Sequence, residues 1–211
     1  MNEIFKKKHR EKTPKHTLKV IHVERIWQRE EGVGHPKSAC GPAAAAMVVK
    51  YLSRKGFVTF DSMENTELVN VLYRKIGTFP WGTTAGRLKR KLRFILNRWA
   101  IEGKWDVETT PAKKRFYAYC SSIDDELPVI ILFPLNFSRN AYSSHHFVVG
   151  IGYKVENSHR YLAVLDPDGG KHNDKVHWIK WEENEPYMKF VFLKRFNVPD
   201  RRCTFFKKKL R

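Results

Sequence analysis

The spacing of apolar residues changes from helical to strand-like about halfway along the chain. In the first half, apolar positions recur every three or four residues, the period of a helix with one buried face. This pattern predicts helices at 43–52, 68–76, 88–99 and 111–122. Glycine 77 follows the second of them and is expected to end it, because glycine readily adopts the left-handed conformation of a helix C-terminus.

The second half of the chain has the pattern of a sheet. Residues 129–133 form a continuous apolar run, typical of a strand buried on both faces. Further strands are expected at 147–153, 161–165 and 188–193. Near the start of the chain, 16–23 also alternates like a strand, and 105–108 is a short extended segment. Helices followed by an antiparallel sheet predict the α+β fold class.

Three residues with suitable chemistry stand at the ends of these predicted elements. Cys40 comes just before an alanine-rich helix with Pro42 in its first turn, where free backbone N–H groups and the helix dipole favour a thiolate. Paired histidines, His145 and His146, open the strand at 147–153, and Asp166 ends the next one. Each has an ordinary alternative: a small buried thiol, an exposed histidine, an Asp-Pro turn. Together they indicate nucleophilic catalysis.

Strand periodicity does not choose between the two histidines as the base. His145 and His146 are neighbours, so their side chains would point to opposite sides of a strand.

The joint pattern resembles papain-like cysteine peptidases of the bacteriocin-leader type, family thirty-nine of the cysteine peptidases, and in particular their stand-alone bacterial members. The motifs that carry the resemblance are Cys40-Gly41-Pro42-Ala43-Ala44, His146-Phe147-Val148-Val149 and Asp166-Pro167. The resemblance covers 20–193 and implies a papain-like fold, with a helical subdomain packed on an antiparallel sheet and the active-site cleft between them. It also implies a triad of Cys40 as nucleophile, His146 as base and Asp166 as the residue that orients the histidine.

The family's usual oxyanion-hole glutamine stands a few residues before the cysteine, whereas here the only glutamine is Gln28. The stretch from Arg29 to Ala39 separates the two, and it contains a loop that could let Gln28 fold back toward Cys40. Without Gln28, the hole would depend on the Cys40 backbone amide and a neighbour such as Ser38 or His35. Gln28 is therefore the candidate oxyanion donor.

Charge divides the chain into a central domain and two basic tails. The 211 residues carry a net charge of +18, and all of that excess falls on residues 1–19, 194–211 and a helix-like segment at 87–98. We therefore expect an N-terminal tail at 1–19, a peptidase domain at 20–193 and a C-terminal tail at 194–211. The tails could make weak, nonspecific contact with nucleic acid or an anionic membrane surface, although solvated tails are the simpler interpretation.

Other features bound the location and the chemistry. The sequence has no apolar stretch of ~20 residues and no signal-peptide pattern, so no transmembrane segment is expected. Three widely spaced cysteines do not suggest disulfides and favour a reducing cytoplasm. His172 and His177 lack the spacing of a zinc motif, so neither a metal nor a cofactor is expected.

The sequence thus predicts a cysteine peptidase that hydrolyses a peptide or protein substrate through a thioester acyl-enzyme. Two alternatives stay open at this point. The first is an inactive peptide-binding or adaptor domain on the same fold, and the second is a nucleic-acid-associated protein that uses its basic tails.

Overall fold

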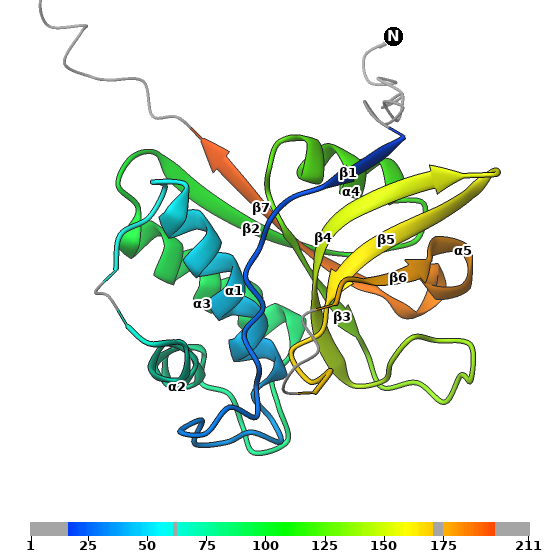
Figure 1. Ribbon diagram of the computed structural model, residues 1–211. Helices are drawn as coiled ribbons and strands as arrows, with labels where there is room; N and C mark the ends of the chain where they lie inside the picture. The colour runs from blue at the N-terminus through cyan, green and yellow to red at the C-terminus, as the bar shows by residue number, and fades with distance from the viewer. Residues whose placement is uncertain (1–16, 61–62, 171–174, 197–211) are drawn as a thin grey trace, which may run out of the picture.

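The computed structural model describes residues 17–60, 63–170 and 175–196, and it has the predicted α+β architecture. Its helices lie mainly on one side of a curved sheet (Figure 1). The helices are α1 (Cys40–Arg54), α2 (Asn65–Ile76), α3 (Ala85–Trp99), α4 (Phe116–Asp124) and α5 (Trp181–Asn184), with a 3-10 turn at Glu185–Tyr187. The strands are β1 (Leu18–Val20), β2 (Lys104–Pro111), β3 (Val129–Phe133), β4 (His146–Glu156), β5 (His159–Leu165), β6 (His177–Lys180) and β7 (Lys189–Phe196).

All seven strands belong to one antiparallel sheet: six follow the order β2-β7-β3-β4-β5-β6, and β1 lies off this path and pairs with β4. The long central strand β4 pairs with β3 through its first half and with β1 through its second half. On its other edge β4 pairs with β5, with Val149 opposite Leu165. The start of β4 and the end of β5 therefore lie at the same end of the sheet.

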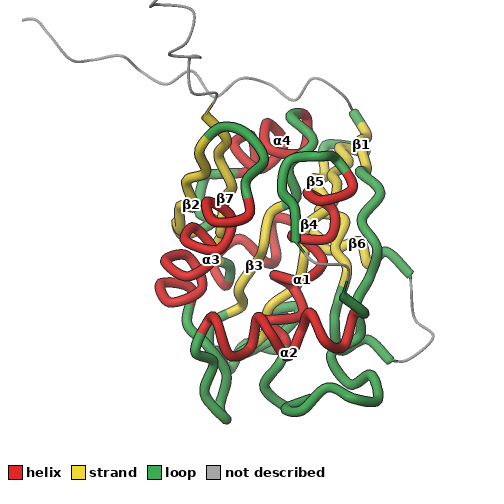
Figure 2. The backbone as a smooth tube through the Cα atoms, turned by 90° about the vertical axis from the view of Figure 1, so that its left-hand side faces the viewer, coloured by secondary structure: helices red, strands yellow, loops and turns green. Residues whose placement is uncertain are grey.

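Helices cover the two faces of the sheet unequally. Helix α1 packs on β4 and is flanked by α2 and α3, which form the helical side seen in Figure 2. Residues Ala43 to Val49 of α1 are all fully buried, because alanine side chains let the helix approach the sheet closely. Helix α4 packs on the opposite face, where the Tyr119 hydroxyl donates to the Gly152 carbonyl at 2.8 Å.

Helix α3 runs in the same direction as α1. Thr83, two residues before α3, contacts Gly41 near the start of α1. At the other end, Ala100 forms an antiparallel bridge with Val58, beyond the end of α1. One end of α3 thus lies beside Cys40, and its other end lies beside the far end of α1.

Some predicted boundaries differ from the structure. The predicted helix at 111–122 begins only at Phe116, because Pro111 still belongs to β2, a sheet-edge strand where proline is tolerated. Strand β1 is shorter than the predicted 16–23, whereas β7 extends three residues past 193. The ranges proposed as tails therefore include sheet residues at their inner ends. The strand β6 and the helix α5 were not predicted.

The segment between β1 and α1 has little regular structure but is firmly attached to α1. Glu24 accepts a hydrogen bond from Lys50 at 2.9 Å and another from Asn65 at 3.1 Å, and it also pairs with Arg54. Burial alone would raise the pKa of Glu24, but these hydrogen bonds and the two positive charges lower it to about 2. The attachment fixes the path of the chain toward residues 25–29, which reach the candidate site.

Candidate active site

Cys40 is the first residue of α1, as the sequence predicted. The preceding residue, Ala39, has no side chain that could cap the helix, and Pro42 has no N–H to satisfy. The thiol is half-buried and free of any disulfide. Cys40 therefore lies where the positive end of a fifteen-residue helix favours a negative charge.

Gly41 allows the start of α1 to approach the sheet. A Cβ atom at Gly41 would lie 2.7 Å from Cγ2 of Thr83 and 3.4 Å from Cδ2 of Phe147. The first of these distances is too short for a real contact, so any larger residue would push α1 away. Because Phe147 directly follows His146, this close packing also brings Cys40 and His146 together.

His146 and Asp166 form a short ion pair at one end of the sheet. His146 is the first residue of β4, and Asp166 directly follows β5, so the antiparallel pairing of these strands makes the two residues neighbours. The Nε2 atom of His146 lies 2.7 Å from Oδ1 of Asp166, and both side chains are largely buried. This leaves Nδ1 as the ring nitrogen available to Cys40.

The imidazole of His146 is held in its charged form by its two neighbours. Burial alone would lower its pKa. Hydrogen bonds and negative charge from Asp166 and Cys40 outweigh burial and raise the pKa to about 10. The imidazolium form of His146 is thus electrostatically favoured at neutral pH.

Asp166 accepts hydrogen bonds on both carboxylate oxygens. Oδ1 also accepts the backbone N–H of Asp168 at 2.8 Å, and Oδ2 accepts the hydroxyl of Tyr142 at 3.0 Å. Burial would raise the pKa of Asp166, but the contacts with His146, Asp168 and Tyr142 together lower it. The carboxylate is therefore charged and fixed in orientation.

Residues 25–29 bind the turn that carries Asp166. The Nε of Arg25 donates to the backbone carbonyl of Asp166 at 2.6 Å, and Arg29 makes a two-pronged contact with the Asp168 carboxylate. The backbone N–H of Gln28 donates to the Pro167 carbonyl at 2.9 Å. Tyr142, Arg25 and Arg29 were not predicted as site residues, because their contacts join segments that are far apart along the chain.

Gln28 itself is 2% exposed and is fixed at both its backbone and its side chain. Its Nε2 donates to the Pro36 carbonyl at 2.9 Å, in the loop that leads to Cys40. Ser38 and His35, the alternative oxyanion neighbours, both contact Tyr73 of α2: the Ser38 hydroxyl is hydrogen-bonded to it, and the His35 ring stacks on it. Gln28 thus contacts both the turn after Asp166 and the loop before Cys40.

His145 occupies a different position from His146. It precedes β4, is exposed and has a left-handed backbone with a φ of 50°. Its ring lies beside Gly82, in the turn between α2 and α3. In the geometry described above, the histidine that contacts Asp166 is His146.

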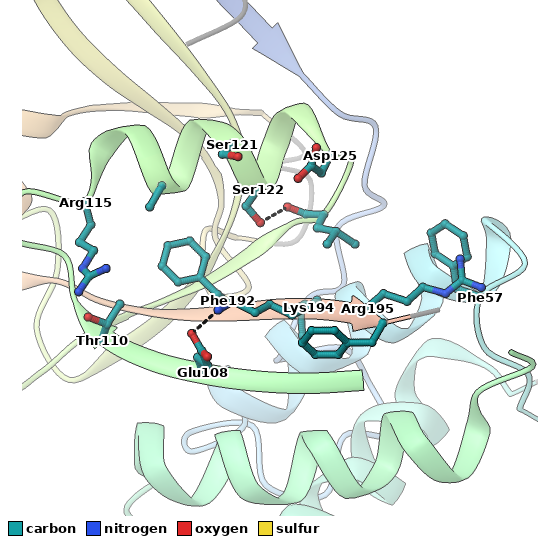
Figure 3. Close-up of a pocket in the computed structure, with 14 residues that line it drawn as sticks. Phe57, Glu108, Thr110, Arg115, Ser121, Ser122, Asp125, Phe192, Lys194 and Arg195 are labelled. Carbon is teal, nitrogen blue, oxygen red and sulfur yellow. Dashed lines mark hydrogen bonds and ion pairs between the residues drawn. The ribbon is translucent and has the colours of Figure 1, made fainter. Parts of the chain in front are cut away.

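An open groove of about 670 Å³ lies away from these residues, between α4 and the strands β2 and β7 (Figure 3). Phe57, at one end of the groove, follows the C-terminal end of α1, whereas Cys40 starts that helix. A Lys194–Glu108 ion pair with a distance of 2.7 Å crosses part of it. The groove is therefore separate from the candidate active site.

Two further expectations concern metals and membranes. Within 17–60, 63–170 and 175–196, no group of three or more His, Cys, Asp or Glu side chains could hold a metal ion. Of the two histidines considered for zinc, His172 lies outside the described residues, and the ring of His177 lies 6.0 Å from that of Tyr142. Among the helices that the structure describes, none combines the length and apolarity needed to cross a bilayer.

Comparison with solved structures defines the class of fold. A crystal structure of UfSP from C. elegans matches 90% of this chain with a TM-score of 0.61 at 11% sequence identity. A digestive procathepsin L2 proteinase from Tenebrio molitor larval midgut matches 82% of the chain with a TM-score of 0.49 at 10% identity. The present chain spans 36% and 64% of those two proteins. The fold is the α+β papain-like fold.

The sequence also matches a family model over most of its length. The model of the Peptidase_C39 like family covers residues 20–193, and the chain belongs to this family. No curated protein sequence gives a significant match. The family and the fold are both those of cysteine peptidases.

Proposed function

We propose that the chain hydrolyses a peptide bond through a triad of Cys40, His146 and Asp166. The observation that supports this most strongly is the placement of His146 between the Asp166 carboxylate, at 2.7 Å, and the Cys40 thiol. A nucleophile, a base and a residue that orients the base are thereby brought together at one end of the sheet.

In the proposed reaction, one proton moves twice: first from Cys40 to His146, and then from His146 to the leaving amine. The Cys40 sulfur attacks the carbonyl carbon of the scissile bond while the proton resides on His146. The imidazolium then gives this proton to the leaving amine, and a thioester remains on Cys40. His146 next takes a proton from a water molecule, which attacks the thioester. The C–S bond breaks, the product leaves as a carboxylic acid that ionises in solvent, and Cys40 and His146 return to their starting thiolate and imidazolium forms.

Asp166 holds the His146 ring in the orientation that this proton transfer requires. Because Asp166 binds Nε2, it keeps Nδ1 directed at the thiol and stabilises the positive charge on the ring. Tyr142 acts one step further out as a positioning residue, since its hydroxyl donates to the other oxygen of the carboxylate.

Replacing Tyr142 with phenylalanine is expected to lower kcat by about tenfold with little change in KM, since one hydrogen bond to a charged group is lost. That hydrogen bond helps to lower the pKa of Asp166, so the variant should also lose activity at a higher pH than the wild type as the solution is acidified. The measurement is the pH profile of kcat/KM from pH 4 to pH 8. Tyr117→Phe, on α4, is the matched control, and an unshifted acid limb in Tyr142→Phe would count against the positioning role.

Gln28 is the proposed side-chain donor of the oxyanion hole, together with the backbone amide of Cys40. In support of this, Gln28 is buried, and its amide is held by Pro36 in the loop before Cys40. One hydrogen of the Nε2 amide is used by Pro36, and the other is available for the oxygen that becomes negative during attack.

Replacing Gln28 with alanine is expected to lower kcat about a hundredfold, the usual effect of losing one oxyanion donor. Steady-state kinetics on a fluorogenic peptide would measure it, with circular dichroism to check that the variant is folded. Alkylation of Cys40 by iodoacetamide needs no oxyanion hole and should keep its wild-type rate. If turnover is unaffected, Gln28 is only a structural residue.

The proposed function is tested most directly by a peptide chloromethyl ketone, which forms a stable thioether with a reactive thiolate and releases chloride, followed by mass spectrometry of the labelled peptide. We expect a single covalent adduct at Cys40 in the folded protein. A folded protein that binds peptides but forms no adduct would instead be an inactive binding domain.

A further inference from the structure

Helix α3 presents a face with a strong positive charge that the fold does not neutralise. The helix contains six basic residues and no acidic one. Within the described part of the chain, Arg87 donates to the Gly77 carbonyl and Arg93 pairs with Asp106. The other four have no such partner among the described residues: Lys89, Arg90, Lys91 and Arg98. Like charges spaced three or four residues apart destabilise a helix, so an anionic partner would reduce the repulsion between the basic side chains of α3.

A small apolar depression lies within this charged face. It has a volume of about 90 Å³, and Ile95, Trp99 and the side chain of Phe94 supply its apolar lining. The side chain of Phe94 is 66% exposed, although it is a large aromatic residue in the middle of the charged face of α3. Three cations surround the depression: Lys91 and Arg98 from α3, and Lys75 from the end of α2. Helices α2 and α3 pack against each other on the helical side of the molecule (Figure 2).

The charged face begins beside the candidate active site. Arg87, in the first turn of α3, lies over the ring of Phe79 at 4.3 Å from its centre, and Phe79 in turn stacks on the exposed Trp81. These rings belong to the turn that contacts Gly41 and His145 through its residues Thr83 and Gly82. From there α3 leads away from Cys40 toward the far end of α1, as described above.

We propose that this face of α3 binds an acidic segment of the peptide substrate, with an apolar side chain of that segment in the depression at Phe94. This inference rests on the proposed peptidase function. The charge of the face selects an anionic partner. Because the face starts at the turn that contacts Gly41, the partner should be a chain that also reaches Cys40. Along the helix, Ala85 and Arg98 are separated by about 20 Å, a distance that about six extended residues span. The acidic segment would therefore lie several residues from the scissile bond.

The test is a fluorescence anisotropy titration with Cys40→Ala protein, which cannot turn the probe over. The probe is a short fluorescein-labelled peptide of glutamates around a single phenylalanine, in ~50 mM salt so that surface charges are weakly screened. We expect saturable binding that weakens by about tenfold or more in Lys91→Glu/Arg98→Glu. The control Lys113→Glu/Arg115→Glu makes the same charge change before α4, on the opposite face of the sheet, and should bind like the parent.

Two further arms identify the partner. Phe94→Ala should weaken the phenylalanine-containing probe about tenfold but should not alter binding of a probe with alanine in its place. A single-stranded oligonucleotide and phosphatidylserine vesicles serve as other anions. If either binds through α3 while the acidic peptide does not, or if Lys91→Glu/Arg98→Glu binds the peptide as well as the parent does, the proposal is wrong.

The same variants test the proposed binding face of α3 independently of the proposed peptidase activity. Lys91→Glu/Arg98→Glu in a protein with an intact Cys40 should react with a small thiol-directed probe at the wild-type rate, because such a probe does not reach α3. Normal labelling with lost peptide binding supports the α3 site. Failure of labelling in the wild type, with peptide binding retained, would overturn the peptidase activity but not the binding face.

Discussion

Replacing Cys40 with alanine is expected to abolish peptide hydrolysis, with a loss of about 10⁴-fold or more in kcat. The reason is chemical rather than structural. The thioester forms on the Cys40 sulfur, and alanine offers no atom that can take its place. The change is small and should leave the fold intact, since α1 already contains a run of buried alanines at this end.

Cys120→Ala is the matched control for this experiment. Cys120 is fully buried in α4, and burial raises the pKa of its thiol, so it should be neutral and unreactive. We expect Cys120→Ala to keep its activity and its labelling at Cys40. Residual hydrolysis in Cys40→Ala, above that of a mock preparation, would show that the nucleophile lies elsewhere.

Replacing His146 with alanine is expected to lower kcat by about 10³-fold or more and to remove the reactivity of Cys40 in mildly acidic solution. An ordinary cysteine thiol with a pKa of ~8.5 is less than about 1% ionised at pH 6. In the wild type, we expect the neighbouring imidazolium to stabilise the Cys40 thiolate, so iodoacetamide should alkylate Cys40 at pH 6 nearly as fast as at pH 8. In His146→Ala, the rate at pH 6 should fall about a hundredfold relative to the wild type.

The sign of the pH dependence follows from the pKa of His146, which is raised to about 10. A raised pKa means that the imidazolium is present throughout the neutral range and is lost only as the pH rises through about 10. The alkylation rates of the two proteins should therefore differ most at the acid end of the range and should converge above pH 10, where an ordinary thiol is also ionised. The measurement is the alkylation rate between pH 5 and pH 10.5, with the modified peptide identified by mass spectrometry.

His145→Ala is the matched control, since the two histidines are adjacent and only His146 contacts Asp166 in the geometry described. It should leave the alkylation profile unchanged. If His145→Ala removes the reactivity at pH 6 and His146→Ala does not, the proposed base is wrong.

The elements around the site could largely be read from the chain because their signals are local. An alanine run behind Pro42 begins a helix at Cys40, and Gly77 ends α2 with a left-handed φ of 68°. Thr84 caps α3 by accepting a hydrogen bond from the N–H of Arg87. The start of α4 was misplaced because Pro111 is paired into the edge strand β2, and such pairing depends on β7, almost eighty residues further along the chain.

The distant contacts of the site had no signal in the sequence. Tyr142 lies in a loop, and nothing near it in the chain indicates that its hydroxyl meets Asp166. Arg25 and Arg29 look like ordinary surface cations, yet they bind the turn from Asp166 to Asp168, about 140 residues away. Such partners are chosen by the packing of whole elements and not by local propensity.

The sequence by itself determined the α+β class, the ends of the main helices and the residue types that can carry thiol chemistry, because periodicity and caps act over a few residues. The tertiary structure decided how His146 meets Asp166, since the antiparallel pairing of β4 with β5 places the start of β4 near the residue that follows β5. Tertiary packing also decided that Gln28 lies buried between two loops and that the charged face of α3 starts beside Cys40. Both depend on contacts between segments that the chain itself keeps far apart.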